Sequence, residues 1–419
     1  MAATKEGVWD LQEARDKLLA GDPWNRYNAL FTAGPNLYGE LGQNNRDGSG
    51  GGTKLAQIDS QENFAHVGGC DNTSFGVTED GKLYSWGASQ FGRLANGGPN
   101  NTYRSSPTQV PGTTWASTCK SATYSMMATK TDGSAWFWGG SGPGNYARSI
   151  AGWPYNNSCS SPVLIPGTWT ANPSRVDQQK MMFTGRAGYA IDSSGNLYSW
   201  GDNEYGCLGL NQPETVYAKT QVGSDSTWKW VTGYQDNSSS NAAAVKTDGT
   251  LWCWGGGGAN GCLGLGPDKN DRSSPTQIGS GTDWTSVSGG QMYWLGGGFC
   301  ATRENGTLWV WGATDRGTFG TNQYDVQFSS PYGCPGGPYK MGQICENTMI
   351  RLKHDDTLWI SGDVHAAGMF PETGHQYMSS PVQVPGALVG FSSDKIGMWG
   401  NGTYLNIGVI TPNLTPAQL

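Results

Sequence analysis

The sequence has little charge, and none of that charge is gathered into a basic segment. Only 14% of its 419 residues are charged, and the formal net charge is −7. Proteins that bind nucleic acid or anionic lipid need clustered lysine and arginine. Neither nucleic acid nor a membrane surface is therefore an expected partner.

The sequence also has no apolar run of membrane-spanning length, and its first residues have no apolar core of a signal peptide. Its nine cysteines are scattered, without a Cys-x-x-Cys pair. An odd, unpatterned set is typical of reduced, buried thiols rather than of a disulfide framework. We therefore expect synthesis in a cytoplasm, no secretory signal and no membrane insertion.

Motifs for nucleotide chemistry occur only in the wrong context. Gly256, Gly258 and Gly261 satisfy the Gly-x-Gly-x-x-Gly pattern, but no helix follows them to hold a phosphate. Residues 76–82 fit the start of a P-loop, but Leu83 stands where Ser or Thr must bind magnesium. We expect no bound nucleotide and no cofactor.

One loop region gathers possible metal ligands, namely Asp363, His365, Glu372 and His375. Their spacing matches no known ligand motif, and solvated loop residues explain them better. The sequence therefore predicts no metal site, no catalytic residue and no enzyme.

Glycine, tryptophan and repetition are abundant. A short apolar run that ends in glycine recurs about every 50 residues, and seven intervals separate its copies. The final glycines are Gly34, Gly87, Gly139, Gly201, Gly255, Gly312, Gly362 and Gly408. A period of this length with several short strands is typical of propeller blades, so the sequence predicts an all-β, seven-bladed β-propeller.

Each repeat contains further landmarks. An Asp-Gly or Asn-Gly pair, such as Asp248-Gly249, precedes most of the runs and predicts a two-residue hairpin turn with positive φ at both centres. Ser-Ser-Pro recurs later, as at 273–275, and predicts a strand that begins at the proline. A tryptophan series that follows the blade period could be mistaken for a sugar-binding ladder, but inter-blade packing explains it better. The predicted structural core is Trp86, Trp138, Trp200, Trp254 and Trp311.

The glycine-ended run occurs eight times for seven intervals. Ring closure explains the extra copy if a strand from one end of the chain completes a blade begun at the other. The sequence leaves open which terminus supplies that strand.

Residues 1–27 lie outside the repeats and form a separate leader before the propeller of residues 28–419. Apolar residues at helical spacing predict one short amphipathic helix that ends near Gly21. The residues expected to mediate assembly are Val8, Trp9, Leu11, Leu18 and Leu19. Because so short a helix is marginal alone in water, it must pack either on the propeller itself or on a partner subunit.

The repeat, Leu-Tyr/Trp-x-Trp-Gly, Tyr-Gly-x-Leu-Gly, Ser-Ser-Pro-Thr-Gln-Val/Ile and Trp-x-x-Val, resembles that of the regulator of chromosome condensation family. The resemblance covers about residues 28–408 and is strongest in the second, fourth and fifth repeats. It implies a seven-bladed propeller. Exchange-factor members carry a Gly-x-x-His segment in each repeat, whereas 67–71 and 288–291 here contain no histidine. Exchange activity on a small GTPase is therefore not expected.

The opening segment, residues 7–17, is similar to the leaders of propeller proteins in bacteriophage virions. This second resemblance implies a non-enzymatic virion protein, a tail fibre or decoration protein displayed on the particle for attachment to host surfaces. The expected partners are other virion proteins and a host surface glycan or protein, with a homo-oligomer or multivalent display. Two alternatives stay open: a cellular scaffold or exchange factor of the same repeat family, and a carbohydrate-binding propeller.

Overall fold

The structure is a computed structural model. It describes residues 28–412 except 59, 61, 98–101, 119–124, 141–157, 173–176, 185–186, 236–239, 258–260, 293–295, 315, 346, 364–376, 385–395 and 401–404. The predicted leader helix, with Val8, Trp9, Leu11, Leu18 and Leu19, lies outside the described residues.

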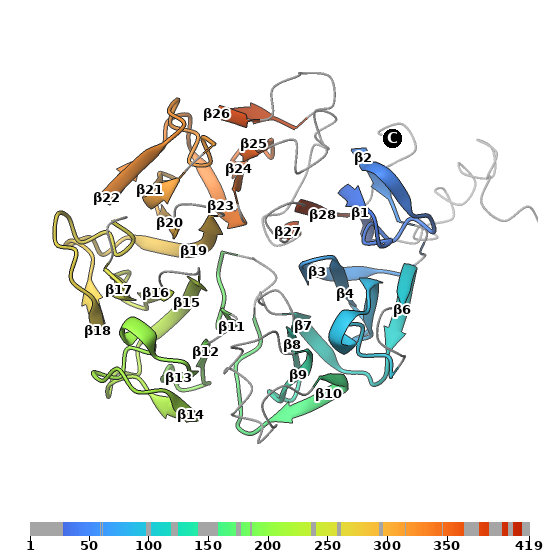
Figure 1. The fold of residues 1–419 in the computed structure, drawn as a ribbon, viewed down its shortest axis with the longest axis horizontal. Coiled ribbons are helices and arrows are strands. Elements are labelled where there is room, and N and C mark those ends of the chain that lie inside the picture. The colour runs from blue at the N-terminus through green and yellow to red at the C-terminus, as the bar shows by residue number, and fades with distance from the viewer. Residues whose placement is uncertain are drawn as a thin grey trace, which may run out of the picture.

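The chain forms seven four-stranded antiparallel sheets around a common centre, which confirms the predicted seven-bladed β-propeller (Figure 1). Blade 1 consists of β3 (Phe64–Cys70), β4 (Thr73–Thr78), β5 (Leu83–Ala88) and β6 (Tyr103–Val110). Blade 2 consists of β7 (Trp115–Thr118), β8 (Ser125–Lys130), β9 (Ala135–Gly139) and β10 (Cys159–Ile165). Blade 3 consists of β11 (Met181–Phe183), β12 (Ala187–Ile191), β13 (Leu197–Gly201) and β14 (Val216–Gln221).

The next three blades repeat this order. Blade 4 consists of β15 (Trp228–Gln235), β16 (Ser240–Lys246), β17 (Leu251–Gly255) and β18 (Arg272–Gln277). Blade 5 consists of β19 (Trp284–Met292), β20 (Gly296–Arg303), β21 (Leu308–Thr314) and β22 (Val326–Gly333). Blade 6 consists of β23 (Tyr339–Cys345), β24 (Thr348–Lys353), β25 (Leu358–Asp363) and β26 (Tyr377–Gln383). In each blade the first strand lies nearest the centre and the fourth forms the rim (Figure 1).

Blade 7 closes the ring with both ends of the chain. Its two inner strands are β27 (Ile396–Gly400) and β28 (Leu405–Pro412), and its two outer strands are β1 (Asn28–Asn36) and β2 (Asp47–Gln57). Seven copies of the glycine-ended run lie in the third strands of their blades. The eighth copy lies in the second strand of blade 7, because Gly408 pairs with Thr32 of β1 and Gly397 of β27. Strands from both ends of the chain thus complete one four-stranded blade, which joins the two termini in a single sheet.

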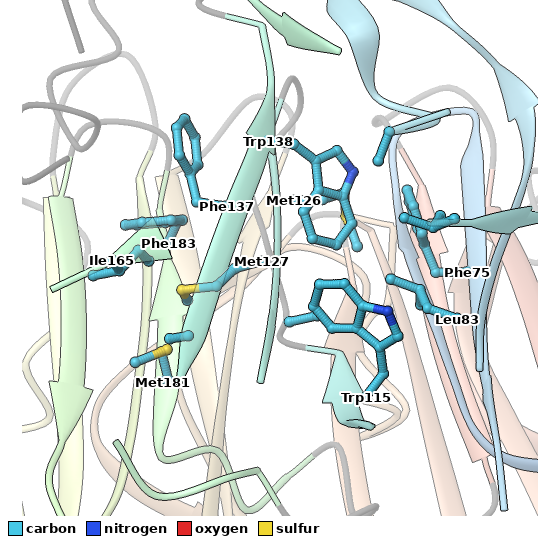
Figure 2. Packing of buried hydrophobic residues seen from close by; sticks show 14 of the residues in the cluster. Phe75, Leu83, Trp115, Met126, Met127, Phe137, Trp138, Ile165, Met181 and Phe183 are labelled. Atoms are coloured by element: carbon cyan, nitrogen blue, oxygen red, sulfur yellow. The ribbon is translucent and has the colours of Figure 1, made fainter. Parts of the chain in front are cut away.

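Side chains that alternate along each strand pack against the two neighbouring blades. In blade 2, Met126 and Trp138 lie toward Phe75 of blade 1, whereas Met127 and Phe137 lie on the opposite side with Phe183 of blade 3 (Figure 2). These residues belong to one buried apolar cluster that spans blades 1 to 3. Strand alternation thus lets one sheet bury both of its faces, which is the source of the core in a closed ring.

The hairpins between second and third strands differ from the predicted two-residue turns. In blade 4, the Gly249 amide donates to the Lys246 carbonyl and the Lys246 amide donates to the Thr250 carbonyl. Gly249 has a φ of 76°, but Asp248 is not in the left-handed region. The connection is therefore a longer loop, a β-turn followed by one left-handed glycine, and the aspartate serves as a side-chain acceptor rather than as a second left-handed centre.

The prediction that strands begin at the proline of Ser-Ser-Pro is also wrong. Pro275 lies inside β18, where the pairing with β17 shifts between Cys253 and Gly255. Pro107, Pro162, Pro331 and Pro381 lie inside the corresponding rim strands β6, β10, β22 and β26. Proline fits there because a rim strand has an unpaired edge and the bulge needs no amide donor.

Candidate interaction face

The two ends of the ring differ in how the chain crosses them. One end, the turn face, carries the hairpins between second and third strands and the crossovers from one blade to the next. The other end, the loop face, carries the turns between first and second strands and the longer loops between third and fourth strands. Because exposed loops on a rigid scaffold are the usual places of recognition, the loop face is the first candidate.

Each described Tyr-Gly-x-Leu-Gly loop lies on the Ser-Ser-Pro strand of the next blade. At the joint between blades 3 and 4, the Asn211 amide donates to the Ser273 carbonyl at 2.7 Å, and a methyl group added to Gly206 would lie 2.5 Å from the Ser273 Cα. We call this contact the clasp. The same amide-to-serine bond occurs from Asn44 to Ser105, from Gly97 to Ser160, from Gly266 to Ser329 and from Asn322 to Ser379. The two sequence motifs are thus the two halves of one inter-blade contact.

The predicted tryptophan series lies beneath the clasps. Trp254 has no exposed surface, and its indole nitrogen donates to the Cys207 carbonyl in the loop of the preceding blade at 2.7 Å. Trp86 makes the same bond to the Glu40 carbonyl, and Trp138 to the Arg93 carbonyl. Trp200 and Trp311 are also fully buried. A buried indole needs such an acceptor, so the bond aligns these three loops with the next blade, whereas the Trp311 indole nitrogen is buried without an acceptor.

Blade 6 has no tryptophan at this position, and a buried guanidinium replaces it. Ser361 stands where blades 1 to 5 have the indole, and Arg351 fills the space with no exposed surface. Its Nη2 donates to the Phe319 carbonyl at 2.6 Å and its Nη1 donates to Ser361 at 2.8 Å. The Ser361 hydroxyl itself donates at 2.6 Å to the Thr318 carbonyl, which is the equivalent of the Cys207 carbonyl. The third strand thus still supplies that donor, and Arg351 adds a bond to the next carbonyl.

The loops hold two aromatic residues in the left-handed region. Phe91 has a φ of 58° and Tyr205 a φ of 63°, and the two side chains are 37% and 38% exposed. This backbone conformation is unfavourable for bulky side chains and persists only where the surroundings impose it. Each residue immediately precedes the clasp glycine, so the clasp fixes where its ring stands on the loop face.

The turn face carries a repeated stack of two tryptophans and one cation. In blade 4, Trp228 and Trp252 lie 6.1 Å apart in an edge-to-face arrangement, and Lys246 lies over both rings at 4.6 and 3.9 Å. Lys246 also pairs with Asp225. Blades 2 and 5 repeat the arrangement with Trp115, Trp136 and Lys130 and with Trp284, Trp309 and Arg303. These lysine and arginine side chains already contact aromatic rings of the same chain, so fewer cationic groups of the turn face are left to bind a partner.

The aspartates of the hairpins have lowered pKa values. In blade 4 the Thr250 hydroxyl donates to Asp248 and accepts from the Trp252 indole. The hydrogen bond from Thr250 lowers the pKa of Asp248 below its ordinary value of 3.8. These aspartates are structural acceptors in turns rather than catalytic acids.

Only one of the four possible metal ligands lies in the described residues. They contain no group of three or more His, Cys, Asp or Glu that could hold a metal ion. His365, Glu372 and His375 of the possible ligand set lie outside the described residues, and Asp363 is bonded to Arg316 at 2.7 Å. The described part of the chain also contains no helix with the length and hydropathy needed to cross a bilayer.

Cysteines fall among the buried residues. All eight described cysteines are free thiols, and seven of them are buried. Burial raises the pKa of Cys70 and of Cys207 to about 12. Such thiols are unreactive at neutral pH and behave as small apolar side chains.

Sequence reasoning missed the cation stacks and the buried charges. A basic residue precedes the Asp-Gly or Asn-Gly pair by two positions at Lys130, Lys246 and Arg303, and this spacing could have revealed the stacks. Glu40 and Arg93 occupy the x position of the Tyr-Gly-x-Leu-Gly loop, where other loops have cysteine or threonine. A charged residue at a position that is neutral in other repeats is the signal that could have found them.

Comparison with known proteins agrees with this geometry. Residues 80–125, 194–231 and 248–295 match the sequence profile of the "Regulator of chromosome condensation (RCC1) repeat". Each matched segment begins at the hairpin before a third strand and continues into the first strands of the next blade. The profile therefore spans the inter-blade joint, and these segments carry RCC1 repeats.

Curated relatives resemble the chain over parts of their own length. The mouse E3 ubiquitin-protein ligase HERC2 is 26% identical over 78% of this chain, but the match spans 7% of that protein. The mitochondrial RCC1 domain-containing protein RUG3 of Arabidopsis thaliana is 27% identical over 43% of this chain and 39% of its own length. The chain thus spans less than half of the length of these relatives.

Solved structures show the same fold. Prp20p from Saccharomyces cerevisiae superposes with a TM-score of 0.70 and 14% identity over 93% of this chain and 92% of its own. Human WBSCR16 gives a TM-score of 0.70 and 14% identity over 92% of this chain and 99% of its own. At this identity the likeness establishes the fold, an RCC1-like propeller, and leaves partners to be argued from the site.

Proposed function

We propose that this RCC1-type repeat propeller is a non-enzymatic scaffold that binds a partner protein through its loop face. The observation that carries the proposal is the placement of Phe91 and Tyr205, two partly exposed rings held in a strained backbone conformation by the clasps. Aromatic residues dominate the energy of protein interfaces, and a ring that is already fixed costs less entropy to bind. The strained backbone at Phe91 and Tyr205 thus supports the proposal that their rings are held in place for contact with a partner protein.

Charge supports a partner with a basic surface. The chain carries a net charge of −7, and complementary charge accelerates association and selects among partners. The structure report on Prp20p describes binding to Gsp1p and to histones, and a Caenorhabditis elegans relative is named a GTPase regulator homolog. Histones and small GTPases are therefore the first protein classes to test with this chain.

Scaffolding is preferred over nucleotide exchange and over display on a virion. The stretches that correspond to the histidine-bearing segment of exchange factors contain none here, and Asp71 in one of them is paired with Arg93. The relatives named above are eukaryotic proteins, which favours an interaction scaffold over the virion role suggested by residues 7–17. Anchoring by the leader stays a prediction for the residues outside the described structure.

The test compares two faces of the molecule with the same type of substitution. Phe91→Asn and Tyr205→Asn remove both rings, and asparagine tolerates the left-handed region, as Asn211 does here. The matched control replaces two exposed apolar residues of rim strands, Leu164→Asn and Tyr332→Asn. Binding of purified histone H2A–H2B dimer and of a purified small GTPase is measured by interferometry at two salt concentrations.

We expect binding that weakens with salt, a loss of at least about tenfold in the loop-face double variant, and an unchanged rim variant. Release of a fluorescent nucleotide from the GTPase should stay at its uncatalysed rate. Equal affinity of the two double variants, or no binding of either partner at micromolar concentration, would count against the proposal.

A further inference from the structure

One clasped joint buries an acid where the others do not. At the joint between blades 7 and 1, the x position of the Tyr-Gly-x-Leu-Gly loop is Glu40, which has no exposed surface. Its Oε2 accepts the Tyr38 amide at 2.6 Å, whereas its Oε1 has no hydrogen-bond partner. The equivalent residues of the other described loops are Arg93, Cys207, Cys262 and Thr318, and none of them is an acid. A buried carboxylate oxygen without a partner is costly and needs an explanation.

A second carboxyl group beside Glu40 has the same deficit. Asp71 lies between β3 and β4 and is 5% exposed. Its Oδ2 pairs with Arg93 Nη1 at 2.5 Å, and its Oδ1 has no partner. The negative charge of Asp71 disfavours a second negative charge on Glu40 and so contributes to raising the pKa of Glu40. The joint therefore holds two carboxyl groups, one guanidinium and two unpaired oxygens.

A proton on Glu40 explains how this joint tolerates a second buried acid. A neutral carboxyl group costs less to bury than a carboxylate, so a proton on Glu40 reduces the cost of its unpartnered oxygen and removes its repulsion with Asp71. A metal ion fits less well, since Arg93 already neutralises Asp71 and the described residues offer no third acidic, histidine or cysteine ligand. We propose that Glu40 is protonated in the folded protein, so that the joint that closes the ring is proton-linked.

The position of Glu40 explains why its protonation matters to closure. Its carbonyl accepts from the Trp86 indole at 2.9 Å and from the Ser74 hydroxyl at 2.7 Å. The Trp399 indole donates to the same Ser74 hydroxyl at 3.1 Å. Glu40 belongs to the N-terminal half of blade 7 and Trp399 to the C-terminal half. This hydrogen-bonded chain thus connects both ends of the protein to blade 1.

The direction of the pH effect follows from the groups that face Glu40. Burial, and to a smaller extent the charge of Asp71, raises the pKa of Glu40 from 4.5 to about 7. Arg93 is paired with Asp71, and Cys70 stays neutral because burial raises its pKa to about 12. A raised pKa contributes stability that is present below pH 4.5 and is lost as pH rises through 7. Between pH 5.5 and 8.5 the unfolding equilibrium constant should rise by roughly 30-fold through this group.

The test uses the whole chain and the variant Glu40→Gln, whose side chain has nearly the same shape and is neutral at every pH. The control is Glu204→Gln, which removes an exposed acid from the equivalent loop of blade 3. Two quantities are measured from pH 5.5 to 8.5: the unfolding equilibrium constant from urea titrations, and the nuclear magnetic resonance signal of the Trp86 indole hydrogen.

We expect the Trp86 signal to titrate near pH 7 in the wild type and in Glu204→Gln, but not in Glu40→Gln. Glu40→Gln should also lose the roughly 30-fold pH dependence that the other two proteins share. Identical pH profiles in all three proteins would overturn the proposal. Recovery of wild-type stability at pH 8.5 on adding millimolar calcium chloride would also overturn it, in favour of a cation site.

Discussion

The joint between blades 3 and 4 and the joint between blades 2 and 3 hold neighbouring sheets together in different ways. At the first, a glycine-rich loop is bonded to the Ser273 carbonyl of a rim strand. At the second, the rim strand β14 carries Tyr217, Ala218 and Lys219 in place of Ser-Ser-Pro, and Tyr217 is 56% exposed. No hydrogen bond from a described residue of blade 2 reaches this strand. Apolar packing remains, with Phe137 and Phe183 edge to face at 6.0 Å.

The two halves of the clasp are absent together. Residues 141–157, which follow the third strand of blade 2, contain no Tyr-Gly-x-Leu-Gly, and β14 contains no Ser-Ser-Pro. Two motifs about 70 residues apart in the chain therefore behave as one contact. The difference teaches that buried apolar area alone can close a joint, while the clasp fixes the orientation of the loop and hence of the loop face.

Gly206→Ala should have the largest effect on a clasped joint. The added methyl group would lie 2.5 Å from the backbone of Ser273, and the φ of 73° disfavours any Cβ. We expect a loss of about 3 kcal/mol or more in the free energy of unfolding, measured by urea titration. Gly223→Ala is the matched control, because its φ is 63° and nothing lies within 4 Å of the added methyl group. It should lose only about 1 kcal/mol, and equal losses would contradict a role of close approach.

Trp254→Phe and Phe137→Leu compare the two joints directly. The first removes a buried indole and its bond to the Cys207 carbonyl, which leaves that carbonyl with the Tyr189 hydroxyl as its remaining donor. The second removes only apolar volume at the unclasped joint. We expect losses of about 3 and about 1.5 kcal/mol respectively in the free energy of unfolding. Hydrogen exchange should also increase at Asn211 in the first variant, and an unchanged loop there would show that the indole does not align it.

The sequence was sufficient for the blade count because its period repeats one supersecondary unit. Local chemistry was harder. Pro275 suggested a strand start because proline lacks an amide hydrogen, but the rim position makes the same deficit harmless within the strand. Asp248 suggested a left-handed turn centre, although its carboxylate acts instead as an acceptor for Thr250. In both cases one residue property allowed two placements, and only the tertiary neighbours decide between them.

The loop face could be predicted only in part. The recurrence of Tyr-Gly-x-Leu-Gly predicts a repeated loop, but not that Phe91 and Tyr205 adopt positive φ or that the loop reaches the next blade. Glu40 and Asp71 are 31 residues apart in sequence, and their proximity depends on how the two ends of the chain close the ring. A repeat pattern therefore predicts the fold of each repeat but not the contacts between repeats.

Lys219→Pro should have the smallest effect and tests whether β14 still has the shape of a clasped rim strand. By register Lys219 corresponds to Pro275, since Thr220 pairs with Ser199 as Thr276 pairs with Cys253. The bulge should accept proline, so we expect a loss of no more than about 1 kcal/mol in the free energy of unfolding, arising from the lost contact between Lys219 and the Trp169 ring at 4.8 Å. Lys219→Ala isolates that contact and should lose the same amount. The loss from proline could instead exceed the loss from alanine by about 2 kcal/mol or more. In that case residue 219 would need an amide donor where the clasped blades need none. The rim strand of blade 3 would then differ from the others in backbone as well as in sequence.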